Sequence, residues 1–146
     1  MKVSIIVSVF NNKNTIAAAI NSIISQDYDD IECIVVDAGS IDGTIEIIKG
    51  FADRINTFIS EPDKGIYDGL NKGVSLATGD VIAFLHSDDA YADRSIISTV
   101  VDQFDINIQG VYGDLLYTDK VDMDKIFRYW KSCDFSPSLL SKGWMP

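Results

Sequence analysis

The sequence predicts an α/β fold built on a mostly parallel, doubly wound sheet with helices on both faces. Over residues 1–86, short apolar runs alternate with segments whose apolar residues recur at helical spacing. This alternation is typical of parallel sheets whose crossover helices cover both faces. After about residue 108 apolar and polar residues alternate in a way that suits antiparallel strands, so we expect antiparallel additions there.

Four strands are expected in the first part of the chain. The run VSIIVSVF at residues 3–10 is continuous and β-branched, as in a strand that is covered on both faces. The next runs are IECIVV at 31–36, the weaker INTFIS at 55–60 and DVIAFL at 80–85. Because a helical segment separates each run from the next, parallel pairing is favoured.

Each connection between these strands carries a helical pattern. Apolar residues at helical spacing predict helices within residues 13–25, 42–54 and 64–77, and Gly79 ends the third helix. The chain up to residue 86 therefore reads as strand and helix in strict alternation.

Beyond the fourth strand the pattern loosens. Residues 93–104 carry a further apolar stripe at helical spacing. The segments GVYGDLLYT, at 110–118, and KIFRYWK, at 125–131, alternate as antiparallel strands do.

Composition and charge describe one ordinary soluble domain and exclude several classes of protein. The 146 residues are 47% hydrophobic, and 12 basic against 22 acidic residues give a net charge of −10, which argues against a nucleic-acid partner. No apolar run approaches the roughly 20 residues that span a bilayer, and we identify no signal peptide. The two cysteines have no metal-ligand spacing, and a single histidine excludes His-rich metal sites. We therefore expect a cytoplasmic protein.

Polar side chains cluster where each predicted strand ends. The clusters lie at residues 8–11, 37–40, 61–64 and 86–89. The carboxyl ends of parallel strands meet at one edge of a sheet, and ligands of doubly wound folds bind in the crevice there. The sequence therefore predicts a ligand site at this edge.

After the fourth apolar run, His86 and Ser87 lead into two adjacent carboxylates, Asp88 and Asp89. Like charges repel, so the pair is favourable only if a cation sits beside it or if the turn is solvated. The segment EPDKGIYDGLNKG supplies local cations in Lys64 and Lys72. An acidic pair that faces lysines suits a metal-bound diphosphate, although a solvated helix face has the same composition.

Several phosphate-binding classes lack their signature here. The segment DAGSIDGT, at 37–44, suits either a plain strand–turn–helix connection or part of a site. The first strand is followed by NNKNT, so a dinucleotide-binding G-x-G-x-x-G is absent there, as is a P-loop from the whole chain. A receiver domain needs an acid pair where Asn11 and Asn12 stand, and a nucleotidyltransferase needs a Gly-rich basic loop.

Four segments in this order, VSIIVSVFNN, IVVDAGSIDGT, EPDKGIYDGLNKGVSLATGDVIAFLHSDD and KGWMP, resemble the nucleotide-sugar-binding half of the inverting family 2 glycosyltransferases. The resemblance covers nearly the whole chain and implies a GT-A, Rossmann-like fold. It implies transfer of a sugar from a nucleotide diphosphate donor, with a UDP-sugar favoured, to an acceptor hydroxyl with inversion and with Mg²⁺ or Mn²⁺. We expect residues 1–146 to form a single domain, with a donor half at 1–90 and the start of a truncated acceptor half at 91–146.

The resemblance also implies roles for individual residues. Asp88 and Asp89 match the metal-binding acidic motif of the DXD type, with Asp89 as the direct ligand. Asp37 matches an acid that accepts a hydrogen bond from the nucleotide base, and Ser8 and Phe10 match the base pocket, where Phe10 stacks on the base. Four residues match the region near the ribose, the diphosphate and the donor sugar: Lys64, Asp68, Asn71 and Lys72.

The chain departs from the family pattern at two positions. Many relatives carry a second acid where Ala38 stands, so base recognition can differ, and His86 replaces a common Asn and is interpreted as structural. The family's catalytic base is a carboxylate of the acceptor half, which we expect beyond Pro146. Asp114 and Asp119 are available, but nothing in the sequence distinguishes them from surface residues.

The leading hypothesis is a glycosyltransferase of polysaccharide or cell-surface glycan synthesis. Its partners would be the nucleotide-sugar donor and a glycan or lipid-linked acceptor, which would bring the full enzyme to the inner face of the membrane. The alternative is a non-catalytic nucleotide-sugar-binding module, or an inactive fragment that lacks the base. Uncovered apolar residues such as LLSKGWM favour self-association into a homo-oligomer.

Overall fold

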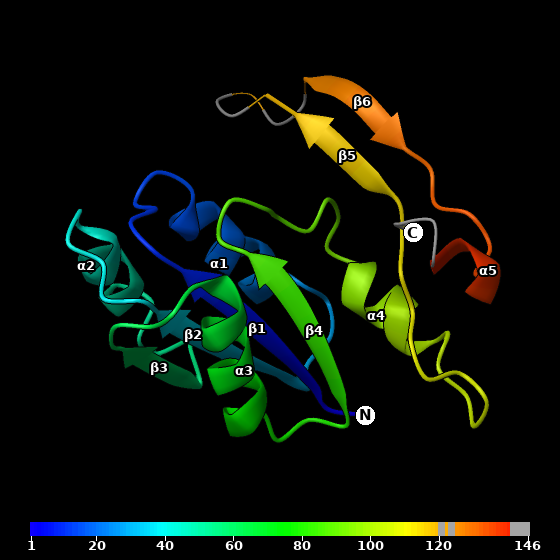
Figure 1. Cartoon of the computed structure of the whole chain (residues 1–146), viewed down its shortest axis with the longest axis horizontal. Coiled ribbons are helices and arrows are strands. Elements are labelled where there is room, and N and C mark those ends of the chain that lie inside the picture. Colours follow the sequence, from blue (N-terminus) through cyan, green and yellow to red (C-terminus); the bar gives the residue numbers. More distant parts are fainter. Residues whose placement is uncertain (120–121, 123–124, 141–146) are drawn as a thin grey trace. The chain divides into compact units, whose positions relative to one another are not determined.

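A computed structural model of the chain describes residues 1–119, 122 and 125–140, which divide into two compact units, Met1–Val101 and Asp102–Pro146. The first unit contains, in chain order, β1 (Val3–Val9), α1 (Ile16–Ile24), β2 (Ile31–Asp37), α2 (Thr44–Lys49), β3 (Thr57–Ser60), α3 (Ile66–Leu76), β4 (Val81–His86) and α4 (Ile96–Val101) (Figure 1). The second contains β5 (Leu115–Thr118), β6 (Ile126–Trp130) and α5 (Pro137–Leu140). The predicted division into halves at residue 90 stays a prediction.

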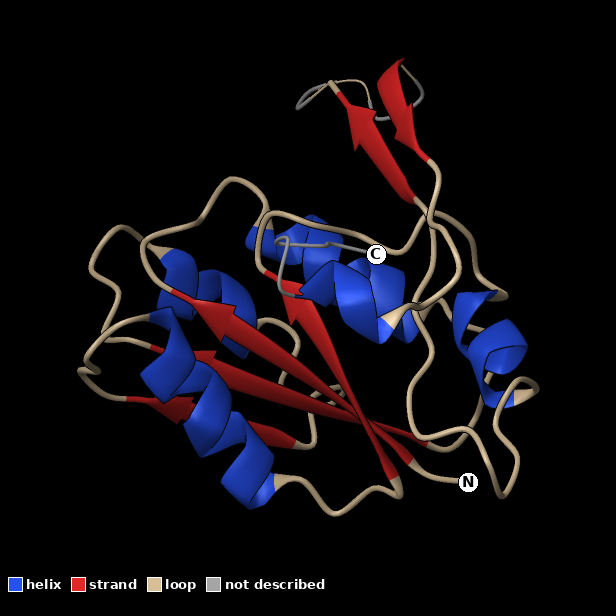
Figure 2. Cartoon of the chain, turned by 45° about the vertical axis from the view of Figure 1, so that its right-hand side comes forward, coloured by secondary structure: helices blue, strands red, loops and turns tan. Residues whose placement is uncertain are grey.

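The first unit is built on a parallel sheet with the strand order β3-β2-β1-β4, seen side by side in Figure 2. In register, Val3 pairs with Ile31 and Val81, so the three longest strands begin together. All seven residues of β1 are buried, which confirms that the continuous apolar run is a strand covered on both faces. The carboxyl ends of all four strands meet at one edge.

Helices cover both faces of this sheet, as the doubly wound prediction requires (Figure 1). Because side chains alternate along a strand, Ile5, Val7 and Val9 face one way and Ile6 the other. The first set packs in a core with α1, α2 and α4, which contribute buried isoleucines at Ile16, Ile20, Ile23, Ile48 and Ile97. Ile6 belongs to a second core with Ile34 and Val36, against which Leu70 of α3 packs.

Helix α3 approaches β1 at a distance that only glycine permits. A Cβ atom at Gly73 would lie 2.3 Å from Cγ2 of Ile6, and one at Gly69 would lie 2.6 Å from Oγ of Ser8. The two glycines are four residues apart, so they share one face of the helix. Their lack of side chains sets how closely α3 packs on the sheet.

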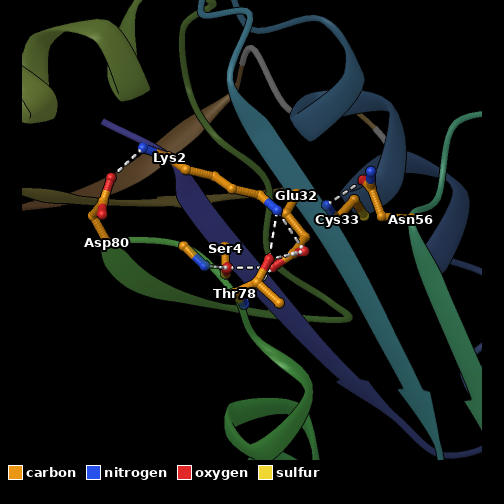
Figure 3. Close-up of polar contacts among 8 residues, drawn as sticks. Lys2, Ser4, Glu32, Cys33, Asn56, Thr78 and Asp80 are labelled. Carbon is orange, nitrogen blue, oxygen red and sulfur yellow. Dashed lines mark hydrogen bonds and ion pairs between the residues drawn. The ribbon is translucent and has the colours of Figure 1, made fainter.

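At the amino ends of the strands, a buried carboxylate ties three segments together (Figure 3). The side chain of Glu32 accepts hydrogen bonds from Lys2 Nζ at 2.8 Å, Ser4 Oγ at 2.5 Å, and the amide and hydroxyl of Thr78 at 2.8 and 2.6 Å. Burial by itself raises the pKa of Glu32, but these hydrogen bonds outweigh it and lower the pKa to about 2. These hydrogen bonds of Glu32 fix the α3–β4 connection to the start of β1 and β2.

The second unit contains an antiparallel hairpin, as predicted for the segment after about residue 108. Leu115 pairs with Trp130 and Leu116 with Tyr129, and a register shift follows at Tyr117. The two strands form a sheet of their own. The guanidinium of Arg128 lies over the rings of Tyr117, 5.7 Å from its centroid, and Trp130, 4.8 Å from its centroid.

The helices are shorter than the apolar patterns predict. The segment 42–54 forms a helix only over Thr44–Lys49, because the hydrogen bonds that follow, from Phe51 to Ile48 and from Ala52 to Lys49, span three residues and form turns. The four-residue α5 was not predicted, because one turn is too short to show a helical period. No helix in the described part of the chain is long and apolar enough to cross a membrane.

We predict that Gly73→Ala destabilises the protein although alanine is the better helix former. Overpacking against the buried Ile6 should lower the free energy of unfolding by about 1–3 kcal/mol. Urea denaturation followed by circular dichroism measures this, with the exposed Ser75→Ala in the same helix as control. A Gly73→Ala protein more stable than the parent would contradict the close packing.

The hydrogen bonds of Glu32 predict a specific loss of stability in acid. The pKa of Glu32 is about 2 in the folded state against 4.5 for the free side chain, so its contribution is complete above pH 4.5 and is lost as the pH falls toward 2. We expect Glu32→Gln to remove up to about 3 kcal/mol of this pH dependence. Chemical denaturation at a series of pH values between 6 and 2 compares the two proteins. If the free energy of unfolding falls with pH equally in both, Glu32 does not make this contribution.

Candidate functional site

The loops that follow the four parallel strands gather at one edge of the sheet and bind one another. The amide of Asn11, after β1, donates to Ser40 Oγ in the loop after β2 at 2.7 Å, and the amide of Asn12 donates to Thr44 Oγ1 at 2.9 Å. In return, Asn11 Oδ1 accepts from the amide of Ile41 at 2.9 Å. Asn11 itself has a φ of 47°, a left-handed conformation that asparagine tolerates better than most residues.

Asp37, predicted to contact the nucleotide base, is fully buried at the end of β2 and organises the surrounding loops. Its Oδ2 accepts from the amides of Gly39 and Ser40 at 3.0 and 2.9 Å and from Ser60 Oγ at 2.7 Å. Its Oδ1 accepts from Ser40 Oγ. Protein donors thus occupy both carboxylate oxygens, and a direct contact with a base stays a prediction.

The two other residues predicted for the base pocket differ in exposure. Ser8 lies near the end of β1 and is buried beneath Gly69 of α3. Phe10 follows β1, and 60% of its surface is exposed at the edge of the sheet. An exposed aromatic ring in this place is free to stack on a flat ligand.

The acidic pair follows β4 in a turn whose first residue is held tightly. The side chain of Ser87 is nearly buried, whereas Asp88 and Asp89 are exposed. The amide of Asp89 donates to the carbonyl oxygen of His86 at 3.0 Å, which closes the turn. Desolvation and the neighbouring charge of Asp88 raise the pKa of Asp89, against a smaller opposing effect of His86.

The acidic pair offers only part of a metal coordination sphere. The described residues contain no group of three or more His, Cys, Asp or Glu side chains that could hold a metal ion. Two carboxylates do fit Mg²⁺ or Mn²⁺, because these ions prefer oxygen ligands and complete their coordination with water and substrate phosphates. Asp88 and Asp89 therefore suit an ion that binds together with an anionic ligand.

The start of α3 brings together two of the residues predicted to lie near the diphosphate. Lys72 Nζ lies 2.9 Å from Glu61 Oε1 and 3.8 Å from Asp68 Oδ2, and it donates to the carbonyl oxygen of Pro62 at 3.2 Å. The hydrogen bond to Glu61 raises the pKa of Lys72. The positive charge of Lys72 is therefore already paired with two carboxylates of the protein.

Lys64 and Asn71 are both exposed, and they differ from Lys72 in their contacts. The amide of Lys64 donates to Asp68 Oδ2 at 3.1 Å, which shapes the turn into α3. Within residues 1–119, 122 and 125–140, no ion pair engages the ammonium group of Lys64. Lys64 is accordingly the more available cation of the two lysines.

Sequence reasoning missed a group of small polar residues that hold these loops together. Asn12, Thr15 and Ser60 lie outside the predicted clusters, whereas Ser40 and Ser87 lie within them but without a predicted partner. Each lies just beyond a strand or before a helix, where such residues are ordinary in any fold. The hydrogen bonds that join them across loops span 23 to 75 residues of sequence, so no local pattern could distinguish these residues from turn residues.

Comparison with known proteins gives consistent similarities. The family model described as Glycosyl transferase family 2 matches residues 4–139. The PGL/p-HBAD biosynthesis glycosyltransferase of Mycobacterium tuberculosis is 30% identical over 143 residues, which make up 96% of this chain and 55% of that protein. The chain therefore spans about half the length of this curated relative.

Two solved glycosyltransferase structures share the GT-A fold. S. aureus TarS 1–349 in complex with UDP-GlcNAc has a TM-score of 0.64 and 26% identity, and the match covers 70% of this chain and 30% of TarS. The mannosyltransferase PcManGT from Pyrobaculum calidifontis, in complex with GDP-Man and Mn²⁺, has a TM-score of 0.69 and 23% identity, covering 84% and 37%. These matches confirm the predicted fold class.

The bonds of Asp37 predict that its substitution acts first on stability. Asp37→Asn replaces one acceptor oxygen by an amino group that faces N–H and O–H donors, so we expect unfolding to become easier by about 1.5–3 kcal/mol. Thermal and urea denaturation measure the change, with the exposed Asp53→Asn as matched control. A variant as stable as the parent that fails to bind UDP would instead assign Asp37 to the ligand.

Proposed function

The chain belongs to glycosyl transferase family 2, and we propose that it binds the nucleotide diphosphate sugar donor of a metal-assisted, inverting transfer to an acceptor hydroxyl. The proposed site is the carboxyl edge of the parallel sheet. The observation that carries the proposal is the exposed pair Asp88–Asp89 at the end of β4, in a chain whose family transfers sugars.

Electrostatics supports a cation at this pair. The chain has a net charge of −10, and desolvation together with the neighbouring charge of Asp88 raises the pKa of Asp89, so the charged form of Asp89 is costly. A divalent cation removes that cost and lets a diphosphate approach an acidic surface. Mg²⁺ or Mn²⁺, when bound, would neutralise charge that develops on the departing nucleotide diphosphate.

Residues at the same edge are suited to the remaining parts of the donor. The exposed ring of Phe10 would stack on the base, with Ser8 and Asp37 at the ends of the neighbouring strands. Lys64, Asp68, Asn71 and Lys72 would lie near the ribose, the diphosphate and the sugar. Lys64 is the best placed to contact the diphosphate, because the ammonium group of Lys72 already forms ion pairs with Glu61 and Asp68.

A UDP-sugar is the favoured donor. TarS, at 26% identity, is described in complex with UDP-GlcNAc, and this likeness supports a uridine nucleotide here. A GDP-sugar is the alternative, since Ala38 stands where many family members carry a second acid at the base site. The acceptor we propose is a glycan or a lipid-linked sugar on the cytoplasmic side.

We propose none of the described carboxylates as the catalytic base. In an inverting transfer, a carboxylate must remove the proton of the attacking hydroxyl. Asp114 suits this role poorly, because hydrogen bonds from Tyr129 and Ser132 lower its pKa to about 2. We therefore propose a base beyond Pro146. The chain spans about half the length of the mycobacterial relative, which leaves room for a base outside it.

The first experiment is a calorimetric titration of the chain with UDP and GDP, each with and without Mn²⁺. We expect Mn²⁺-dependent binding, tighter for UDP, that weakens by at least about tenfold in Asp89→Asn. Asp53→Asn, an exposed carboxylate outside the site, is the control and should bind as the parent does. Absence of binding to both nucleotides would contradict the proposal.

Turnover distinguishes an enzyme from a module that only binds the donor. The chain is incubated with UDP-sugar and a mixture of candidate acceptors, and UDP release is measured. Donor binding without release would favour the binding module or an incomplete enzyme.

A further inference from the structure

Helix α1 presents two different faces to the rest of the first unit. Its isoleucines Ile16, Ile20 and Ile23 are buried in the core. Thr15, the N-cap residue, and Ser22 are seven residues apart and lie on a second, polar side of the helix, and Gln26 follows just beyond the helix end. Together with Asn12 in the preceding loop, these three residues form what we call the α1 clamp.

Two members of the α1 clamp hold the residue directly before the acidic pair. Asn12 Nδ2 donates to Ser87 Oγ at 2.9 Å, and Thr15 Oγ1 donates to the carbonyl oxygen of Ser87 at 2.7 Å. Ser87 is only 8% exposed. Its side chain and its backbone are thus both fixed one bond away from Asp88.

The other two members hold the chain after the acidic pair. Ser22 Oγ accepts from the amide of Tyr91 at 3.1 Å. The amide side chain of Gln26 donates to the carbonyl oxygen of Asp93 at 2.8 Å and accepts from the amide of Ile97 at 2.9 Å. Asp88, Asp89 and Ala90 therefore lie between two fixed points, Ser87 and Tyr91.

Thr15 occupies a position where its hydroxyl would ordinarily serve the helix. It is the N-cap residue of α1, yet its side chain makes no capping hydrogen bond. Threonine at an N-cap usually accepts a bond from an amide of the first turn, which stabilises the helix. Here the hydroxyl donates to Ser87 instead. A residue that forgoes the usual N-cap hydrogen bond in favour of a distant partner is expected to have another role.

We infer that the α1 clamp positions the acidic pair, with Asn12 and Thr15 as positioning residues that hold Asp88 and Asp89 ready for a divalent cation and a diphosphate. The inference rests on the proposed function of this site. Two like charges in one short turn repel each other, and an unanchored turn relaxes by moving them apart. Anchoring the turn before the ligand arrives removes that reorganisation from the cost of binding.

The test uses Thr15→Val, which keeps the shape of the side chain and removes its donor. Binding of Mn²⁺ in the presence of UDP is followed by electron paramagnetic resonance, with Mn²⁺ and GDP in parallel. We expect binding to weaken about 10- to 100-fold, as for other residues that orient metal ligands. Thr15→Ser, which retains the hydroxyl, should restore the affinity.

A second pair of variants examines the side-chain bond to Ser87. Asn12→Ala removes it and should weaken Mn²⁺–UDP binding in the same way. Asn14→Ala is the matched control, because Asn14 is exposed in the same loop. Parent-like binding by both Thr15→Val and Asn12→Ala would overturn the inference.

Amide hydrogen exchange supplies a readout that needs no ligand. We expect residues 88–92 to lose protection in Thr15→Val and Asn12→Ala while β1 keeps its own. Unchanged exchange in this turn would overturn the clamp. If the parent chain binds neither Mn²⁺–UDP nor Mn²⁺–GDP, the proposed function fails, and the exchange measurement still decides whether α1 fixes the turn.

Discussion

All seven residues of β1 are buried between two layers of helices, and this burial constrains the rest of the first unit. The strand pairs with β2 on one side and β4 on the other, so its position sets where both neighbours end. On one face α3 can cover it only because Gly69 and Gly73 carry no side chains. On the other face α1 covers it with isoleucines. The interior is apolar throughout its middle, which leaves the ends of the strands as the places for charged chemistry.

The carboxylates at the ends of the strands fall into two groups, those that protein donors bond and those that are exposed. At the amino ends Glu32 is compensated by Lys2, Ser4 and Thr78, and its role is structural (Figure 3). At the carboxyl ends Asp37 is likewise satisfied by protein donors, whereas Asp88 and Asp89 are exposed side by side. A carboxylate whose donors lie within the protein stabilises the fold, whereas an exposed pair with no ion-pair partner among the described residues is suited to a cation from solution. This contrast, more than the number of acids, distinguishes the candidate site.

Helix α1 connects the stability of the fold to the geometry of that site. Its apolar side packs in the core, while Thr15 at its N-cap and Ser22 hydrogen-bond the segment that carries the acidic pair. A change that shifts the helix would therefore act on both. Such coupling is expected where a ligand site is supported by rigid secondary structure, because precise placement of the ligand groups requires a support that does not move.

Local patterns in the sequence determined the order of strands and helices, the family and the prominence of Asp88 and Asp89, because periodicity and short motifs depend on neighbouring residues. Tertiary structure alone decided that Asp37 also accepts a hydrogen bond from Ser60 and that Lys72 forms an ion pair with Glu61. It also decided that Asn12 and Thr15 hold Ser87, across 75 and 72 residues of sequence. Such contacts exist only once parallel pairing brings the ends of β1 and β4 together, and a pattern read along the chain does not contain that distance.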